Sequence, residues 1–153
     1  MMMNTKVLSG WIDDVLKKRA FSKRRYTWYR HHPETILVLD LQKSDYSGQY
    51  YVNLAVALRG LNPEEFPSEE RCHIRIRLDK VIDDQKTVLT VFDLENRALT
   101  DNERCQQIRE MIGRGSQWLE ELATPEAIAR RLSSNESLRN RTTVQARRFL
   151  NIK

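Results

Sequence analysis

The chain has 153 residues, of which 40% are hydrophobic and 31% charged, and its formal net charge is +5. At this length we expect a single domain, 1–153, and no stretch reaches the roughly 20 apolar residues of a membrane span or the apolar run of a signal peptide. Two cysteines without a Cys-x-x-Cys pair exclude a disulfide framework, so we expect reduced thiols in a cytoplasmic protein.

An amphipathic helix is the first predicted element. It follows Met1 to Met3, three consecutive methionines that leave the start codon open. Apolar residues recur at the spacing of one helix face, namely Val7, Leu8, Trp11, Ile12, Val15 and Leu16. We expect this helix to cover the apolar face of a sheet.

Three runs rich in aromatic and β-branched residues come next and predict three strands. They are Arg24–Arg30, Thr35–Gln42 and Gln49–Leu58. Turn-forming residues separate them at 31–34 and 44–48, so the three strands should form two hairpins.

The alternation of side chains sets the expected pairing of these strands. We expect Arg30 to pair with Thr35, and Gln42 with Gln49. One sheet face is then continuously apolar and holds Tyr26, Trp28, Leu37, Leu39, Leu41, Tyr50, Val52 and Leu54. A slip of one residue in the second hairpin would set Asn53 against the leucines, so burial selects this pairing.

A fourth strand is predicted at Cys72–Leu78, with Ile74, Ile76 and Leu78 in the core. The reverse face of the sheet then gathers polar residues, namely Arg25, Asp40, Gln42, Tyr51, Asn53, His73, Arg75 and Arg77, and a smaller apolar group, Tyr29, Ile36, Val38, Ala55 and Ala57. Antiparallel sheets commonly leave one face in water, which is the simplest interpretation. Alternatively, the guanidinium groups of Arg75 and Arg77 project together and could hold a carboxylate or a phosphate.

The remaining segments predict short elements and then helices. Asn62 and Pro63 favour a short helix, and the alternation in Thr87–Leu94 favours a fifth strand. Thr100 and Glu103 form a capping box for a helix that we expect to stop at Gly113–Gly115. A second short helix should bury Trp118, Leu119 and Leu122, and a third, opened by Thr124 and Pro125, should bury Ile128 and Leu132.

Basic residues concentrate in two segments. Seven lie from Lys17 to Arg30 with no acid, and seven lie from Arg130 to Lys153 beside Glu136 alone. A basic surface with interleaved aromatic residues could bind nucleic acid. The predicted pairing places Tyr26 and Trp28 in the core, however, so we favour a solvated basic surface.

Motifs of known catalytic chemistry are missing from the sequence. It contains no P-loop, nucleophile elbow or zinc-protease motif, and the three histidines have no metal-site spacing. We therefore predict no metal and no cofactor. An enzyme that uses dispersed arginine, tyrosine and acidic residues stays open, because such sites leave no local motif.

Four ordered segments resemble the bacterial family catalogued as domain of unknown function 4304. They are Ala20–Arg30, Leu39–Ser44, Ser47–Leu54 and His73–Leu78. The family-like region covers about 5–132 and leaves a basic helical tail at 133–153. The resemblance implies a small bacterial cytosolic α+β protein and brings no catalytic residue, cofactor or substrate. Ala20 stands where the pattern has a glycine.

Together these features predict an α+β fold, an antiparallel meander of four to five strands covered on one face by an N-terminal helix and C-terminal helices. We expect a non-enzymatic binding module with a protein partner. An immunity-like protein, which neutralises a toxin by binding it, would be one example of such a module. The candidate binding residues are Gln42, Ser44, Tyr51, Asn53, Arg75 and Arg77. The alternatives are an enzyme acting on a small anionic substrate and a nucleic-acid binder.

Overall fold

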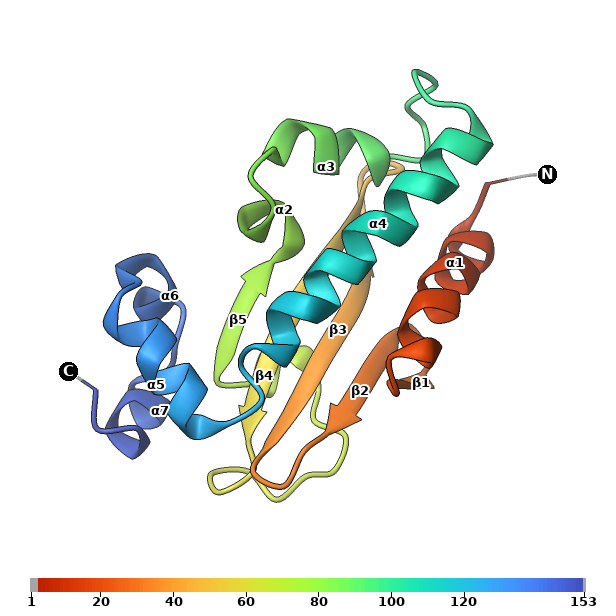
Figure 1. The fold of residues 1–153 in the computed structure, drawn as a ribbon. Helices are drawn as coiled ribbons and strands as arrows, with labels where there is room; N and C mark the ends of the chain where they lie inside the picture. Colours follow the sequence, from red (N-terminus) through yellow and green to blue (C-terminus); the bar gives the residue numbers. More distant parts are fainter. Residues whose placement is uncertain (1–2, 153) are drawn as a thin grey trace.

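The protein folds as a five-stranded antiparallel sheet with strand order β1-β2-β3-β4-β5 and helices from both parts of the chain on one face, as predicted (Figure 1). The structure is a computed structural model that describes residues 3–152. The strands are β1 (Ser22–Arg24), β2 (Thr27–His31), β3 (Thr35–Lys43), β4 (Tyr50–Leu58) and β5 (Ile74–Arg77). The helices are α1 (Thr5–Lys18), α2 (Leu78–Val81), α3 (Gln85–Val91), α4 (Asp101–Glu120), α5 (Pro125–Ser133), α6 (Glu136–Asn140) and α7 (Val144–Phe149), with a 3-10 turn η1 (Glu69–Arg71).

The main core lies between the sheet and the two long helices. Figure 1 shows α1 and α4 crossing the same face of the sheet. Their inward residues pack against the odd-numbered residues of β3 and the even-numbered residues of β4, and this core includes Leu8, Ile12, Leu16, Trp28, Leu37, Leu39, Leu54, Ile108, Ile112 and Leu119. The predicted N-terminal helix is confirmed, and Asn4 caps it by accepting a hydrogen bond from the amide of Val7.

The strand pairing differs from the predicted one by two residues in both hairpins. Trp28 pairs with Leu39 rather than Leu37, and Gln42 pairs with Tyr51 rather than Gln49. The centre of each turn lies one residue further along the chain than expected, which moves every pair by two. Side chains alternate with a period of two, so the predicted sheet faces survive this change.

The predicted first strand, Arg24–Arg30, is wrong as a continuous element. A turn divides it into β1 and β2, and Arg25 in that turn has a φ of 56°. Tyr26 is consequently 44% exposed rather than part of the core. The predicted pairing of Arg30 with Thr35 also sets Arg25 opposite Asp40, but Thr27 takes that position and donates a hydrogen bond of 2.7 Å to Asp40 Oδ1.

The predicted fifth strand at Thr87–Leu94 is also wrong, because this segment forms α3. Asp84 caps that helix by accepting from the amide of Thr87. Val88, Val91 and Phe92 become buried at helical spacing. The fifth strand of the sheet is β1 instead.

The short helix expected at Asn62 is absent from the described residues. Asn62 Oδ1 instead accepts from the amide of Glu64 at 2.9 Å, which closes a local turn. The segment from 59 to 73 then passes over the reverse face of the sheet with Phe66 packed inward.

Helix α4 does not stop at Gly113–Gly115 but continues to Glu120. Neither glycine has a positive φ. A Cβ on Gly115 would lie 2.9 Å from Leu78 Cδ1, so glycine here permits close packing rather than ending the helix. The capping box of Thr100 and Glu103 is confirmed.

The C-terminal helices α5, α6 and α7 gather beside β5 (Figure 1). Thr124 caps α5, and Ile128 and Leu132 are buried as predicted. Thr142, between α6 and α7, forms an isolated bridge with Ile74 of β5. Met1, Met2 and Lys153, which the sequence analysis named, lie outside the described residues. Within 3–152, no helix combines the length and the hydropathy needed to cross a membrane.

Candidate functional site

The reverse face of the sheet has two halves with different surroundings. The covered half consists of Tyr29, Ile36, Val38, Ala55, Ala57 and Cys72, and Phe66 of the 59–73 segment packs against it. The ring of Tyr29 meets that of Phe66 edge to face at 5.2 Å, and the guanidinium of Arg24 lies 3.4 Å from the Phe66 ring centroid. Burial raises the pKa of the Cys72 thiol to about 12. This half is a second small core.

The open half consists of Thr27, Asp40, Gln42, Tyr51, Asn53 and Arg77, on neighbouring positions of β2 to β5. Asn53 connects them, because its Nδ2 donates to Gln42 Oε1 at 3.0 Å and to Asp40 Oδ2 at 3.3 Å. Asn53 itself is buried. The polar side chains are therefore held in place by one another before any ligand arrives.

The two arginines of β5 differ in their surroundings. Arg75 donates from Nε and Nη2 to the two carboxylate oxygens of Glu69, at 2.9 and 3.1 Å. This hydrogen bonding raises the pKa of Arg75 above its usual value. Arg77 instead stacks over the ring of Tyr51, 4.1 Å from its centroid. Within residues 3–152, the guanidinium of Arg77 makes no hydrogen bond or ion pair.

A hollow of about 720 Å³ adjoins the open half, between β5 and the segment from Asn140 to Thr143. Four basic side chains line it, Arg75, Arg77, Lys80 and Arg141, against the single carboxylate of Glu69. The remaining lining includes Gln42, Asn53, His73 and Thr142. Its potential should therefore favour an anionic group.

Backbone contacts hold the far wall of the hollow against β5. The amide of Thr143 donates to the carbonyl of His73 at 2.9 Å, and the amide of Arg75 donates to the carbonyl of Arg141 at 3.4 Å. Thr142 is buried, and its hydroxyl donates to the carbonyl of Leu138. The edge of β5 is thus occupied by the protein's own chain over these residues.

His73 connects this wall to the sheet. Its Nδ1 accepts a hydrogen bond of 3.0 Å from the amide of Leu58, and burial lowers the pKa of the imidazole. The neutral ring is the form that can accept this bond. His73 consequently supports the backbone on two sides.

The structure brings five of the six predicted site residues together. Gln42, Asn53, Arg75 and Arg77 line the hollow, and Tyr51 supports Arg77. Ser44 lies apart, in the turn after β3, where its hydroxyl accepts from the amide of Tyr46. Lys80 and Arg141 also line the hollow, but the sequence did not identify them as site residues. The sequence signals only that Arg141 belongs to a basic segment.

The other histidines contact acidic side chains in separate places. His31 Nε2 lies 3.6 Å from Glu65 Oε2, and His32 Nε2 lies 3.5 Å from Glu120 Oε2. Among residues 3–152, no three histidine, cysteine, aspartate or glutamate side chains lie close enough together to hold a metal ion.

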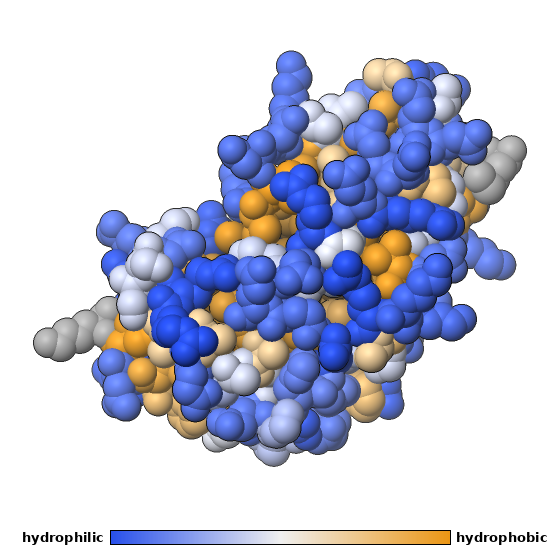
Figure 2. Space-filling model, viewed as in Figure 1, coloured by the Kyte–Doolittle hydropathy of each residue, from blue (hydrophilic) through white to orange (hydrophobic). Residues whose placement is uncertain are grey.

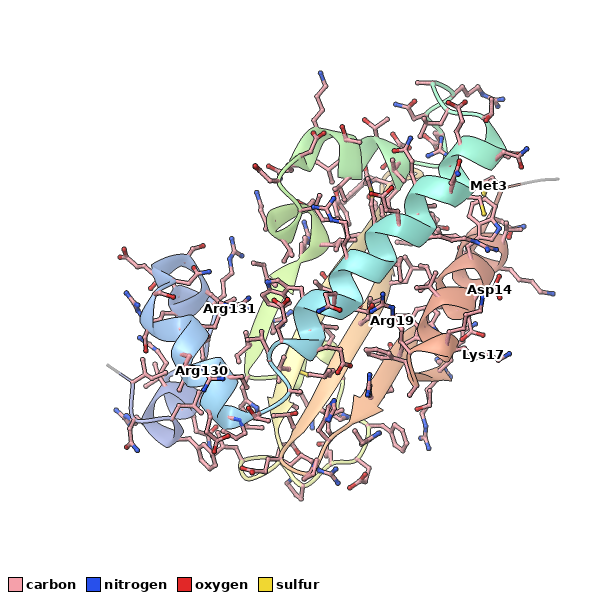
Figure 3. All side chains as sticks on the ribbon, in the orientation of Figure 1. Met3, Asp14, Lys17, Arg19, Arg130 and Arg131 are labelled. Carbon is pink, nitrogen blue, oxygen red and sulfur yellow. The ribbon has the colours of Figure 1, made fainter. Side chains whose placement is uncertain are left out.

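The helical face of the molecule carries charges of both signs. Figure 2 shows this face as largely hydrophilic, with apolar patches between charged side chains. Asp14, labelled on α1 in Figure 3, pairs with Arg109 at 3.0 Å, and Arg131 of α5 pairs with Glu121 at 2.8 Å. The positive charge near α1 and α5 is therefore partly neutralised, in contrast to the hollow.

One family comparison fits this chain. No curated protein and no solved structure matches it. The model of the family described as Domain of unknown function (DUF4304) matches residues 12–121, well over half of the 153-residue chain. The match includes the sheet with its open half and ends before α5. The chain therefore belongs to the family described as Domain of unknown function (DUF4304).

Proposed function

We propose that this protein is a non-enzymatic binding module that binds a protein partner through the open half of its sheet and the adjoining hollow. The observation that carries the proposal is the contrast between the two halves of the reverse face. The protein covers one half with its own 59–73 segment and leaves the other uncovered, with side chains that are already fixed by Asn53. Fixed side chains lose little conformational entropy on binding.

A protein partner suits this surface because the open half is a stretch of sheet that continues into a shallow hollow. Tyr51 and Arg77 are of the residue types that dominate binding energy at protein interfaces. An immunity-like role, in which a small protein neutralises a toxin by binding it, is one form of this function. A cytoplasmic location belongs to the proposal, and the free thiols of Cys72 and Cys105 support it.

The test blocks the open half without removing a charge. Gln42 is exposed on the open half, whereas its neighbour Lys43 points to the opposite side of the same strand. Proteins captured from a bacterial lysate by the parent are identified, purified and titrated against the parent, Gln42→Tyr and Lys43→Tyr by calorimetry. We expect Gln42→Tyr to weaken binding at least about ten-fold, which corresponds to about 1.4 kcal/mol.

Lys43→Tyr is the control, and we expect it to bind the partner with the same affinity as the parent. If every captured protein bound Gln42→Tyr as tightly as the parent, the open half would not be the binding surface. Hydrogen exchange of the complex provides a second reading, since amides of β4 and β5 should gain protection there and those of α1 should not.

An enzyme that acts on a small anionic substrate is a second candidate, favoured by the size of the hollow. About 720 Å³ lies within the usual range of small-molecule sites, roughly 300 to 1,000 Å³. Under this candidate a small anion would bind in the hollow, and Gln42→Tyr and Lys43→Tyr would capture the same proteins. A nucleic-acid binder receives less support, because acidic side chains interrupt the basic surface near α1 and α5.

A further inference from the structure

Three cations of the hollow lack an acidic partner within residues 3–152. They are Arg77, Lys80 and Arg141, which line the same hollow. Six arginines contact a carboxylate at distances between 2.5 and 3.1 Å, namely Arg30, Arg59, Arg71, Arg75, Arg109 and Arg131, and of these only Arg75 lines the hollow. Like charges that share a small space repel one another, so an anion placed among them would be stabilised.

Each of the three cations comes from a segment whose backbone is anchored. Arg77 ends β5 and is stacked on Tyr51. Lys80 belongs to α2, whose residue Leu78 is buried in the core. Arg141 precedes the buried Thr142, and its carbonyl accepts from the amide of Arg75. The directions from which the three charges reach the hollow are thus set by the fold.

Two other polar groups of the hollow are already engaged. Arg75 donates from Nε and Nη2 to the carboxylate of Glu69, and Asn53 donates to Gln42 and Asp40. A ligand should therefore meet Arg77, Lys80 and Arg141 first. The planar edge of Arg77 fits the two oxygens of a carboxylate, and Lys80 supplies a mobile charge beside it.

We propose that these three residues form a seat for the carboxylate groups of an acidic segment on the protein partner. This inference rests on the proposed function and names the chemistry of that partner. The three cations line one hollow, which Glu69 also lines, and Asp40 accepts a hydrogen bond from its lining residue Asn53. A continuous phosphate backbone would pass close to both acids and be repelled, whereas single carboxylates can enter between them.

The seat combines residues from inside and outside the family match. Arg77 and Lys80 lie within residues 12–121, whereas Arg141 lies beyond them. The C-terminal segment would therefore contribute one of the three cations of the seat. Loss of Arg141 alone should weaken binding of the acidic segment while leaving the contacts of the open half in place.

The first experiment uses a defined probe. A blocked peptide of alternating Glu and Gly is titrated into the isotope-labelled full chain at low salt and followed by NMR, with the matched Gln and Gly peptide as a neutral control. We expect the Glu peptide to shift amides of 75–80 and 140–143, and the Gln peptide to shift none of them. Added salt should weaken the interaction.

The decisive variants have matched charge. The triple variant Arg77→Gln, Lys80→Gln, Arg141→Gln is compared with Lys17→Gln, Arg114→Gln, Arg130→Gln, which removes three exposed cations elsewhere. We expect the first to lose about ten-fold in affinity for the Glu peptide and the second to change little. Circular dichroism and a thermal melt confirm that both remain folded.

Three results would overturn the inference. They are equal losses in the two triple variants, shifts located outside the hollow, and preferential binding of a short DNA duplex that displaces the Glu peptide. The proposed function fails separately, through the comparison of Gln42→Tyr with Lys43→Tyr. A partner that is sensitive to Gln42→Tyr but indifferent to the cation triple variant would keep the proposed function and remove the carboxylate seat.

Discussion

The covered half and the open half of the reverse sheet face are built on the same strands, yet only one of them is packed. Ala55 and Ala57 of β4 lie under the 59–73 segment, whereas Tyr51 and Asn53 of the same strand lie beyond it. Apolar residues line the covered half, and hydrogen-bonding residues line the open one. This sheet face is therefore not uniformly solvated: the chain buries its apolar half and leaves an ordered polar surface beside it.

Two tyrosines provide the largest test of this comparison, since Tyr29 lies in the covered half and Tyr51 in the open half. We expect Tyr29→Ala to lower the free energy of unfolding by roughly 3 to 5 kcal/mol, the range for a buried large aromatic residue. Tyr51→Ala should cost about 1 kcal/mol or less, because its ring is only partly buried. Urea denaturation measures both values.

Tyr29→Phe serves as the control for the first variant, because it keeps the ring that contacts Phe66. Similar losses for Tyr29→Ala and Tyr51→Ala would contradict the division of the face. This expectation replaces the one from the sequence, which assigned Tyr29 to a wet face.

The cover itself is tested at Phe66. Removing its ring should cost roughly 1.5 to 3 kcal/mol and expose the covered half. In a Cys105→Ser background, Cys72 should react slowly with a thiol reagent at pH 8, since burial raises its pKa to about 12 and leaves little thiolate. Phe66→Ala should accelerate this reaction.

Tyr26→Ala is the matched control for Phe66→Ala, because Tyr26 is an exposed aromatic residue away from Cys72. The covered half would not depend on Phe66 if Cys72 reacted equally slowly in the two variants.

The sequence was sufficient for the faces of the sheet but not for its details. Period-two alternation assigned Trp28 to the core and Asn53 to the reverse face whichever pairing held. The turn at Arg25 carries no glycine or proline, so nothing local marked the break between β1 and β2. In Thr87–Leu94, apolar residues satisfy strand and helix spacing alike, and the cap at Asp84 decides for α3.

The candidate site divides in the same way. Gln42, Tyr51, Asn53 and Arg77 could be grouped from strand alternation alone, because neighbouring strands carry them. Lys80 and Arg141 enter the hollow only through tertiary packing, since α6 and α7 fold back beside β5. The ion pair of Arg75 with Glu69 depends on η1, which the sequence did not predict.

We expect a smaller effect on the free energy of unfolding from His73, which lies where the covered half meets the hollow. Because burial lowers the pKa of His73 below 6.5, the unfolded chain binds its proton at a higher pH than the folded protein does. The contribution of His73 is therefore complete above pH 6.5 and is lost as the pH falls below it. His73→Asn keeps an acceptor for the amide of Leu58 and should reduce this pH dependence in urea denaturation.

The comparison of parent and His73→Asn isolates one imidazole, because His31 and His32 remain in both proteins. An unchanged difference in stability between the two proteins from pH 7.5 to pH 5 would show that His73 does not titrate in this way.

The smallest expected effect on folding comes from exchanging one β5 arginine for lysine. Arg75→Lys and Arg77→Lys each keep the charge at an exposed position, so each should change stability by less than about 1 kcal/mol. Their effects on binding should differ. Arg77→Lys removes the planar edge that we assign to the partner's carboxylate and should weaken binding of the Glu peptide several-fold. Arg75 already donates to Glu69, so Arg75→Lys should change the affinity for the peptide little. Titration of both variants followed by NMR separates these outcomes. An equal loss in the two would mean that the ion pair with Glu69 opens on binding and that both arginines face the ligand. A loss confined to Arg75→Lys would place the carboxylate at Arg75 rather than at Arg77, Lys80 and Arg141.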